Sequence, residues 1–221
     1  MARRTRQQLL DTAFALFARH GFHAVGLDRI LHEVGVTKTT FYNHFESKDD
    51  LILEVIAARD EFEMNLLPEL LRKHGGRTAR GQLGAVFDVL HEWFNSEKFR
   101  GCIFITVAAE FPSPHDPAHK AAAAHKKAVC ELLCDLAVNA GAENPEQLAE
   151  QLCLLMEGAI TVCHVTGNRE AAQLAQGLAA MVLGGHLPAL TSSAGRRGSD
   201  AVPLRLVASS TPLRGQTRFT I

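Results

Sequence analysis

Residues 21–51 read GFHAVGLDRILHEVGVTKTTFYNHFESKDDL, a stretch in which small, apolar and polar side chains follow a definite order. Apolar residues recur at intervals of three and four, which predicts helices over residues 27–34 and 38–44. Gly35 lies between the two helices, where a left-handed residue turns the chain. Thr37 is expected to cap the second helix, because its hydroxyl can accept a hydrogen bond from an early free amide.

A longer amphipathic helix is predicted over residues 4–20, with Gly21 as its C-cap. Its apolar stripe includes Phe14 and Phe17, and the two short helices must pack on this stripe. The apolar positions available for that contact are Ile30, Val34, Val36, Phe41 and Phe45. Residues 1–50 are therefore expected to form a three-helix domain with a helix-turn-helix.

The outer faces of the second short helix carry polar side chains, which are Thr37, Lys38, Thr40, Tyr42, Asn43 and His44. Such a density of donors and acceptors suits groove edges and phosphates. The second helix of a helix-turn-helix normally enters the major groove. Lys48, at the start of the next helix, is placed for a phosphate, and Arg29 and Thr39 complete the set expected to contact double-stranded DNA.

The same residues resemble the N-terminal domain of the TetR/AcrR family of transcriptional regulators. The family hallmark is Gly-Val-Ser/Thr, then Tyr-x-His-Phe, then Lys and Leu. It stands here as Gly35-Val36-Thr37, Tyr42-Asn43-His44-Phe45, Lys48 and Leu51. The resemblance covers roughly residues 5–52 and implies an all-helical dimer with residues 38–44 in the groove. It also implies that Tyr42 and Lys48 contact phosphates, that an effector pocket lies in the larger domain, and that the protein represses transcription.

Three positions depart from the family pattern. Gly26 offers no side-chain acceptor at a cap position where Ser or Thr is common. Leu31 stands where a small Ala is usual, and Thr39 replaces a Gly that permits close backbone approach to DNA. The departure at Thr39 bears on which bases are read and leaves the DNA-binding role in place.

Charge is unevenly distributed along the chain, although the net charge is only −1. Residues 1–48 carry +3, residues 49–190 carry −8 and residues 191–221 carry +4. A basic head on an acidic body is expected when only the head touches a polyanion. Unevenly distributed solvated charge is the alternative interpretation.

The rest of the chain also has helical periodicity. Ser47 is expected to cap a long helix that ends near Lys73, and the remaining helices are predicted at about residues 82–96, 102–110, 117–140, 145–166 and 170–186. The prediction is an all-α fold of about nine helices. It comprises the DNA-binding domain at 1–50, an effector-binding and dimerisation domain at 51–190 and a flexible tail at 191–221. The basic tail either adds phosphate attraction or is simply a solvated end.

Two helices, at about residues 145–166 and 170–187, are candidates for the dimer contact. The first carries Leu152, Leu155, Met156, Ala159 and Ile160, and the second carries Leu174, Leu178, Met181 and Val182. Paired with their symmetry mates, they would form the four-helix interface that a reader of a palindromic operator needs. The alternative is that these stripes only fill the core of one protomer.

A cavity for a small apolar effector is expected among the middle helices, lined by Phe62, Phe87, His91, Phe104, His125 and Met156. Core packing explains any one of these residues equally well. Cys102 follows Arg100-Gly101 at a predicted helix start, where the dipole and Arg100 would lower the pKa of the thiol. Cys102 is therefore a candidate sensor of electrophiles or oxidants, or else a buried packing residue.

Other functions find less support in the sequence. The five cysteines have no CxxC spacing, and His115, Asp116, His119 and His125 lack a convincing fourth ligand, so no disulfide framework, metal or cofactor is predicted. No GxSxG, GxxxxGK[ST], GxGxxG or HExxH motif supports the rival class, a helical enzyme.

The longest clean apolar run is residues 102–109, and Asp11 and Arg19 interrupt any signal peptide, so a cytoplasmic protein without membrane partners is expected. The predicted function is a ligand-released repressor. The second rival is a DNA-binding architectural or division-linked factor of the same fold.

Overall fold

The computed structural model describes residues 2–189, and this part of the chain is built from helices without a strand. The helices are α1 (Ala2–His20), α2 (Leu27–Val34), α3 (Lys38–Tyr42), α4 (Lys48–Gly75), α5 (Ala79–Gly84), α6 (Val86–Phe94), α7 (Ile103–Glu110), α8 (Pro117–Asn139), α9 (Pro145–Thr166) and α10 (Ala171–His186). The predicted all-α class is confirmed. The predicted tail, residues 191–221, lies outside the described residues.

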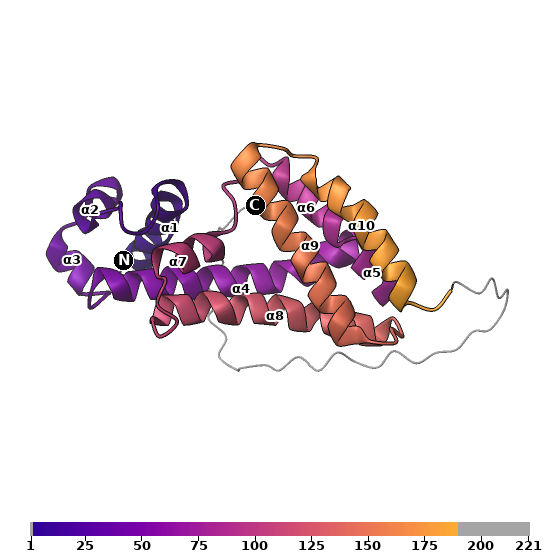
Figure 1. The fold of residues 1–221 in the computed structure, drawn as a ribbon. Coiled ribbons are helices and arrows are strands. Elements are labelled where there is room, and N and C mark those ends of the chain that lie inside the picture. The colour runs from indigo at the N-terminus through magenta and orange to yellow at the C-terminus, as the bar shows by residue number, and fades with distance from the viewer. Residues whose placement is uncertain (1, 190–221) are drawn as a thin grey trace.

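The helices form three regions (Figure 1). Helices α1 to α3 make a head at one end, and α4 runs from the head into the body of the molecule with α8 beside it. Helices α5, α6, α9 and α10 pack together at the far end. At 1.5 Å per residue, the 28 residues of α4 span about 42 Å, so this helix is common to the head and the body.

Local caps set the boundaries of the head helices. Gly35 has a left-handed backbone (φ 75°), and its amide bonds the carbonyl oxygens of Leu31 and His32. Thr37 accepts a hydrogen bond from the Thr40 amide at 3.2 Å, and Ser47 accepts one from the Asp50 amide at 3.0 Å. Both predicted caps are confirmed. Helix α3 ends two residues earlier than predicted, because Asn43 and His44 form a closing turn on Phe41 and Thr39.

The segment predicted as one helix over residues 82–96 is two helices, α5 and α6, which meet at Ala85. Thr78 starts the first helix by accepting a hydrogen bond from the Gly81 amide at 3.1 Å. Gly75 and Gly81 lie so close that a Cβ on either would overlap the carbonyl oxygen of the other. This close approach lets α5 fold back against the end of α4, an arrangement that periodicity alone does not reveal.

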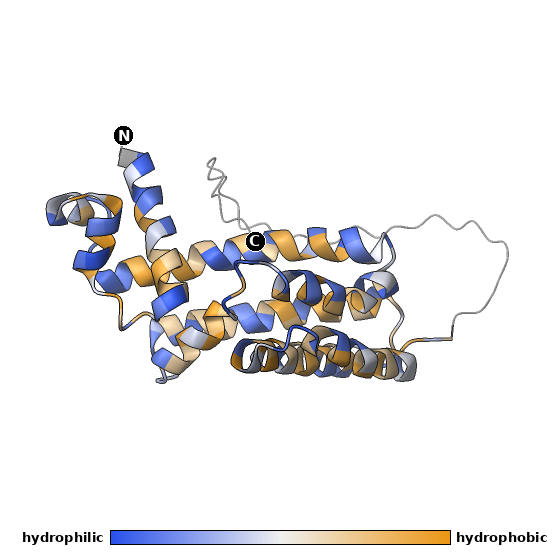
Figure 2. Cartoon of the chain, turned by 90° about the horizontal axis from the view of Figure 1, so that it is seen from above, coloured by the Kyte–Doolittle hydropathy of each residue, from blue (hydrophilic) through white to orange (hydrophobic). Residues whose placement is uncertain are grey.

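The core runs without a gap from head to body, and apolar and polar bands alternate along the helices (Figure 2). Helix α9 is long and apolar enough to span a membrane by length and composition, with a mean hydropathy of 1.3 over 18 residues. In the structure its inner side packs against α8, α6 and α10. Glutamates at 146, 150 and 157 interrupt the apolar sequence of this helix.

Candidate functional site

The outer side of α3 presents polar side chains to solvent. Lys38, Thr39, Tyr42 and Asn43 are exposed, and Tyr42 keeps 57% of its surface open. Phe41, between Thr40 and Tyr42, is fully buried and stacks on Phe45 with ring centroids 5.4 Å apart. One buried aromatic thus anchors the short helix. Lys38, Thr39, Tyr42 and Asn43 are exposed as predicted, whereas Thr40 and His44 are half-buried.

Three basic residues of the head, Lys38, Arg29 and Lys48, already have partners inside the protein. Lys38 pairs with Asp28 at 2.9 Å, and this hydrogen bond and charge raise the pKa of Lys38. Arg29 lies 3.0 Å from His20. Lys48 donates to the Phe22 carbonyl oxygen at 2.7 Å, which ties the start of α4 to the turn after α1.

The three departures from the family pattern are accommodated without distortion. Gly26 precedes α2 in an extended conformation and makes no side-chain cap bond. Leu31 is buried with 5% of its surface exposed, so the larger side chain is packed between the head helices. Thr39 lies on the exposed side of α3.

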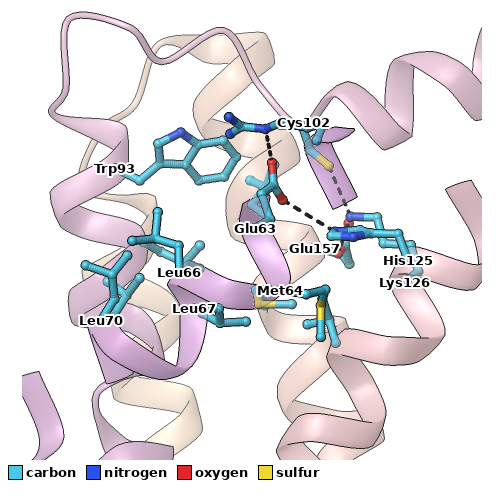
Figure 3. Close-up of a pocket in the computed structure, with 16 residues that line it drawn as sticks. Glu63, Met64, Leu66, Leu67, Leu70, Trp93, Cys102, His125, Lys126 and Glu157 are labelled. Carbon is cyan, nitrogen blue, oxygen red and sulfur yellow. Dashed lines mark hydrogen bonds and ion pairs between the residues drawn. The ribbon is translucent and has the colours of Figure 1, made fainter. Parts of the chain in front are cut away.

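A cavity of about 120 Å³ lies in the body between α4, α6, α8 and α9, with Cys102 at its edge (Figure 3). One wall is apolar and comprises Met64, Leu66, Leu67, Leu70, Val89, Leu90, Trp93, Val129, Met156 and Ile160. The other wall is charged and comprises Arg59, Glu63, His125, Lys126 and Glu157.

The charged wall is internally paired. Glu63 contacts Arg59 at 2.5 Å and His125 Nε2 at 3.4 Å, and His125 Nδ1 lies 2.7 Å from Asp60. Burial alone raises the pKa of Glu63, but His125 and Arg59 outweigh it and lower the pKa. Lys126 bonds Glu157 at 2.7 Å. Because each cation has a carboxylate partner, a charged ligand would have to displace one of them.

Two of the six residues expected to line the cavity, His125 and Met156, do so. Phe104 lies behind His125, stacked on its ring at 3.6 Å, and Phe87 is fully buried in the packing of α6. Phe62 lines a different cleft, between α1 and α4, and His91 lies near Asn95. The charged lining residues were not foreseen, although the i, i+4 spacing of Arg59 and Glu63 on one side of a helix was a usable signal.

Cys102 begins α7, but its surroundings differ from the prediction. Burial raises the pKa of the thiol even though Lys126 donates to its sulfur at 3.2 Å. Arg100 instead bonds the carbonyl oxygens of Glu97 and Phe99. The expected lowering of the pKa is therefore wrong, because the buried position disfavours the thiolate more than the nearby cation favours it. The sensor role stays a prediction.

The histidines of the body are dispersed. His119 contacts the Phe111 carbonyl oxygen at 2.8 Å, His125 belongs to the cavity and His115 is exposed. Within residues 2–189 no group of three histidine, cysteine or carboxylate side chains has the arrangement of a metal site.

Helices α9 and α10 expose large apolar side chains, which are Leu154, Val162, Val165, Leu174, Leu178 and Met181. On α10 these include three of the predicted residues. On α9 the predicted Leu152, Met156, Ala159 and Ile160 are instead buried within the protomer. The apolar character of α9 is broad enough to serve two faces, and the sequence did not show which one points inward.

Comparisons with known proteins agree with this arrangement. Residues 9–55 match the tetR family of bacterial regulatory proteins. Residues 79–179 match the tetracyclin repressor-like C-terminal domain. The structure of SCO4454, a TetR-family transcriptional regulator from Streptomyces coelicolor, is 30% identical with a TM-score of 0.75. The match covers 82% of this chain and 95% of that one.

Curated relatives give the same result. The HTH-type transcriptional regulator YjdC of Escherichia coli is 21% identical over 178 residues, which are 80% of this chain and 93% of that protein. AcrR of Shigella flexneri is 41% identical over 54 residues, 24% of this chain and 25% of that protein. A helical enzyme, the rival from another class, is excluded. The chain belongs to the TetR family of transcriptional regulators, which bind DNA and small-molecule effectors and form dimers.

Proposed function

We propose that this protein is a ligand-released repressor whose dimer places two copies of α3 in the major groove of a palindromic operator. The exposed polar side of α3, anchored by the buried Phe41, carries the proposal. Thr37, Lys38, Thr39, Thr40, Asn43 and His44 are assigned to groove edges and adjoining backbone. Tyr42, Lys48 and Arg29 are assigned to phosphates.

Lys48 can serve both its internal partner and DNA. Its ammonium group has three donors, and the Phe22 carbonyl oxygen takes one of them. Lys38 is different, since a DNA contact must compete with its exposed ion pair to Asp28. Such exposed pairs are weak, so the competition costs little.

Operator binding tests these assignments. Sites are selected from a random duplex pool with the purified dimer, and binding is then titrated by fluorescence anisotropy at several salt concentrations. Lys48→Ala should weaken binding at every sequence and make the salt dependence shallower by about one unit of slope. Tyr42→Ala should also weaken binding. Lys127→Ala on α8, which removes the same charge from an exposed position outside the head, should change neither. An unchanged slope for Lys48→Ala would refute the phosphate assignment.

The cavity is proposed as the effector site, and its size and charge pattern suggest a small neutral molecule with an apolar body. Its volume is near that of a 150 Å³ engineered cavity that accepts benzene, and below the range of about 300–1,000 Å³ usual for larger ligands. Indole and phenol are suitable probes. Each should raise the melting temperature and weaken operator binding, and Leu67→Trp, which fills the apolar wall, should abolish both effects. Probe binding that survives this substitution would place the site elsewhere.

The dimer is proposed to form through the exposed apolar sides of α9 and α10. Leu174, Leu178 and Met181 lie on α10, and Leu154 and Val165 lie on α9. Met181→Glu should shift sedimentation velocity from dimer to monomer, because it would bury an unpaired charge. Val138→Glu, at an equally apolar exposed site on α8, is the control and should leave the dimer intact.

Cys102 is kept as a second sensing candidate, because Lys126 donates to its sulfur at the edge of the cavity. Treatment with N-ethylmaleimide should release the operator from the native chain and not from Cys102→Ala. The cytoplasm is the proposed location.

An architectural factor of the same fold would have binding sites spread over the chromosome, whereas a repressor should bind near promoters. Mapping the binding sites in cells separates the two functions.

A further inference from the structure

Helix α7 is bound to the head by its last residue. The Glu110 carboxylate accepts hydrogen bonds from the amides of Phe22 at 2.9 Å and His23 at 2.7 Å. The Glu110 carbonyl oxygen pairs with His23 Nε2 at 2.9 Å. These amides belong to the turn between α1 and α2. One glutamate thus supplies three contacts to the chain segment that joins the first two head helices.

Gly21 and Phe111 form the surroundings of the Glu110 carboxylate. Gly21 has a positive φ of 83°, and a Cβ there would lie 2.6 Å from Glu110 Oε1. Phe111 packs its ring edge on Phe22 at 5.9 Å and against His23 at 4.8 Å. The carboxylate therefore occupies space that only glycine leaves open, with aromatic packing beside it.

The opposite end of α7 touches the cavity. Cys102, which caps α7, takes a hydrogen bond from Lys126, and Phe104 stacks on His125. Both Lys126 and His125 line the cavity. At 1.5 Å per residue the eight residues of α7 span about 12 Å, so one short helix joins the cavity wall to the head (Figure 1).

The head is held at the peptide between Phe22 and His23 from two sides. Lys48, on α4, donates to the Phe22 carbonyl oxygen, while Glu110, on α7, accepts from the His23 amide. We propose that Glu110 is a positioning residue that sets the angle of the DNA-binding head on the body. This inference rests on the proposed binding of a palindromic operator by the dimer.

Glu110→Asp and Glu110→Ala test the positioning role, the first keeping the charge and withdrawing the carboxylate. Both should lower affinity for the palindromic operator about tenfold and change affinity for an isolated half-site less than about twofold. The reason is that each head still reads DNA while the two are no longer held at the operator spacing. Glu143→Asp and Glu143→Ala, at an exposed position remote from the head, should change neither affinity. Equal losses on operator and half-site, or no loss at all, would overturn the proposal.

The cavity-filling Leu67→Trp separates this inference from the proposed function. If indole and phenol still release the operator from Leu67→Trp while the Glu110 variants lose the operator selectively, the effector cavity fails and the positioning role of Glu110 is supported.

Discussion

The head and the body of this protein place their polar side chains in opposite surroundings. In the head, Thr39, Tyr42 and Asn43 project into water from a helix anchored by one buried aromatic residue. In the body, Glu63, His125 and Lys126 line a cavity and are paired with one another or with near neighbours. A surface that meets a polyanion can leave its donors open to solvent, whereas a cavity wall must satisfy its charges before any ligand arrives.

The largest expected effects come from the buried aromatic residues of the two regions. Phe41→Ala in the head and Phe87→Ala in the body should each lower the free energy of unfolding by about 3–5 kcal/mol, because both rings are almost fully buried. Urea unfolding followed by circular dichroism measures this. The neighbouring Tyr42→Ala should stay within about 0.5 kcal/mol of the native chain. A comparable loss for Tyr42→Ala would contradict the division between anchor and contact residues.

The second-largest loss of stability is expected when a charge is removed from the cavity wall. Glu63→Gln removes the partner of Arg59 and His125 and should cost about 1–3 kcal/mol at pH 7, since the glutamate side chain is 27% exposed.

The effect should depend on pH with a defined sign. The folded-state pKa of Glu63 lies below its ordinary value of 4.5, so its stabilising contribution is present above that pH. It is lost as the pH falls through the folded-state pKa. The gap between native and Glu63→Gln chains in urea unfolding should therefore narrow in acid, and a gap that widened in acid would show that the pairing is misassigned.

Removing one helix N-cap from the head and one from the body should cause a smaller loss of stability. Thr37→Ala removes the cap of α3 and Asn144→Ala removes the cap of α9, where the side chain accepts from the Gln147 amide. Each should cost about 1 kcal/mol of stability. Only Thr37→Ala should also weaken operator binding in anisotropy titrations. Equal binding losses for the two variants would show that stability, rather than the local shape of α3, governs DNA affinity.

The smallest expected effect is a gain. Gly26 precedes α2 in an extended conformation, and a Cβ there would meet no atom within 4 Å. Gly26→Ser can therefore add the missing cap acceptor and should stabilise the chain by a few tenths of a kcal/mol. Thermal unfolding detects this, and a destabilised variant would mean that the extended backbone at residue 26 does not tolerate a serine cap.

The head was foreseen nearly residue by residue, because its turn, caps and apolar positions depend on neighbours within a few residues. Gly35, Thr37 and Ser47 act locally, so their roles follow from residue type and order. The cavity was foreseen only at His125 and Met156. The direction of Phe62 or His91 depends on how helices cross, which hydropathy does not specify.

The sequence by itself determined the helical class, the helix-turn-helix and its exposed polar face, since these follow from periodicity and local capping. Only the tertiary structure decided that Arg59, Glu63 and Lys126 meet at one cavity, that burial disfavours the Cys102 thiolate, and that Glu110 reaches the head. Glu110 and Phe22 are 88 residues apart, and contacts of this kind arise from the packing of whole helices. Chain order fixes local hydrogen bonds, while only packing brings distant charges together in a low-dielectric interior.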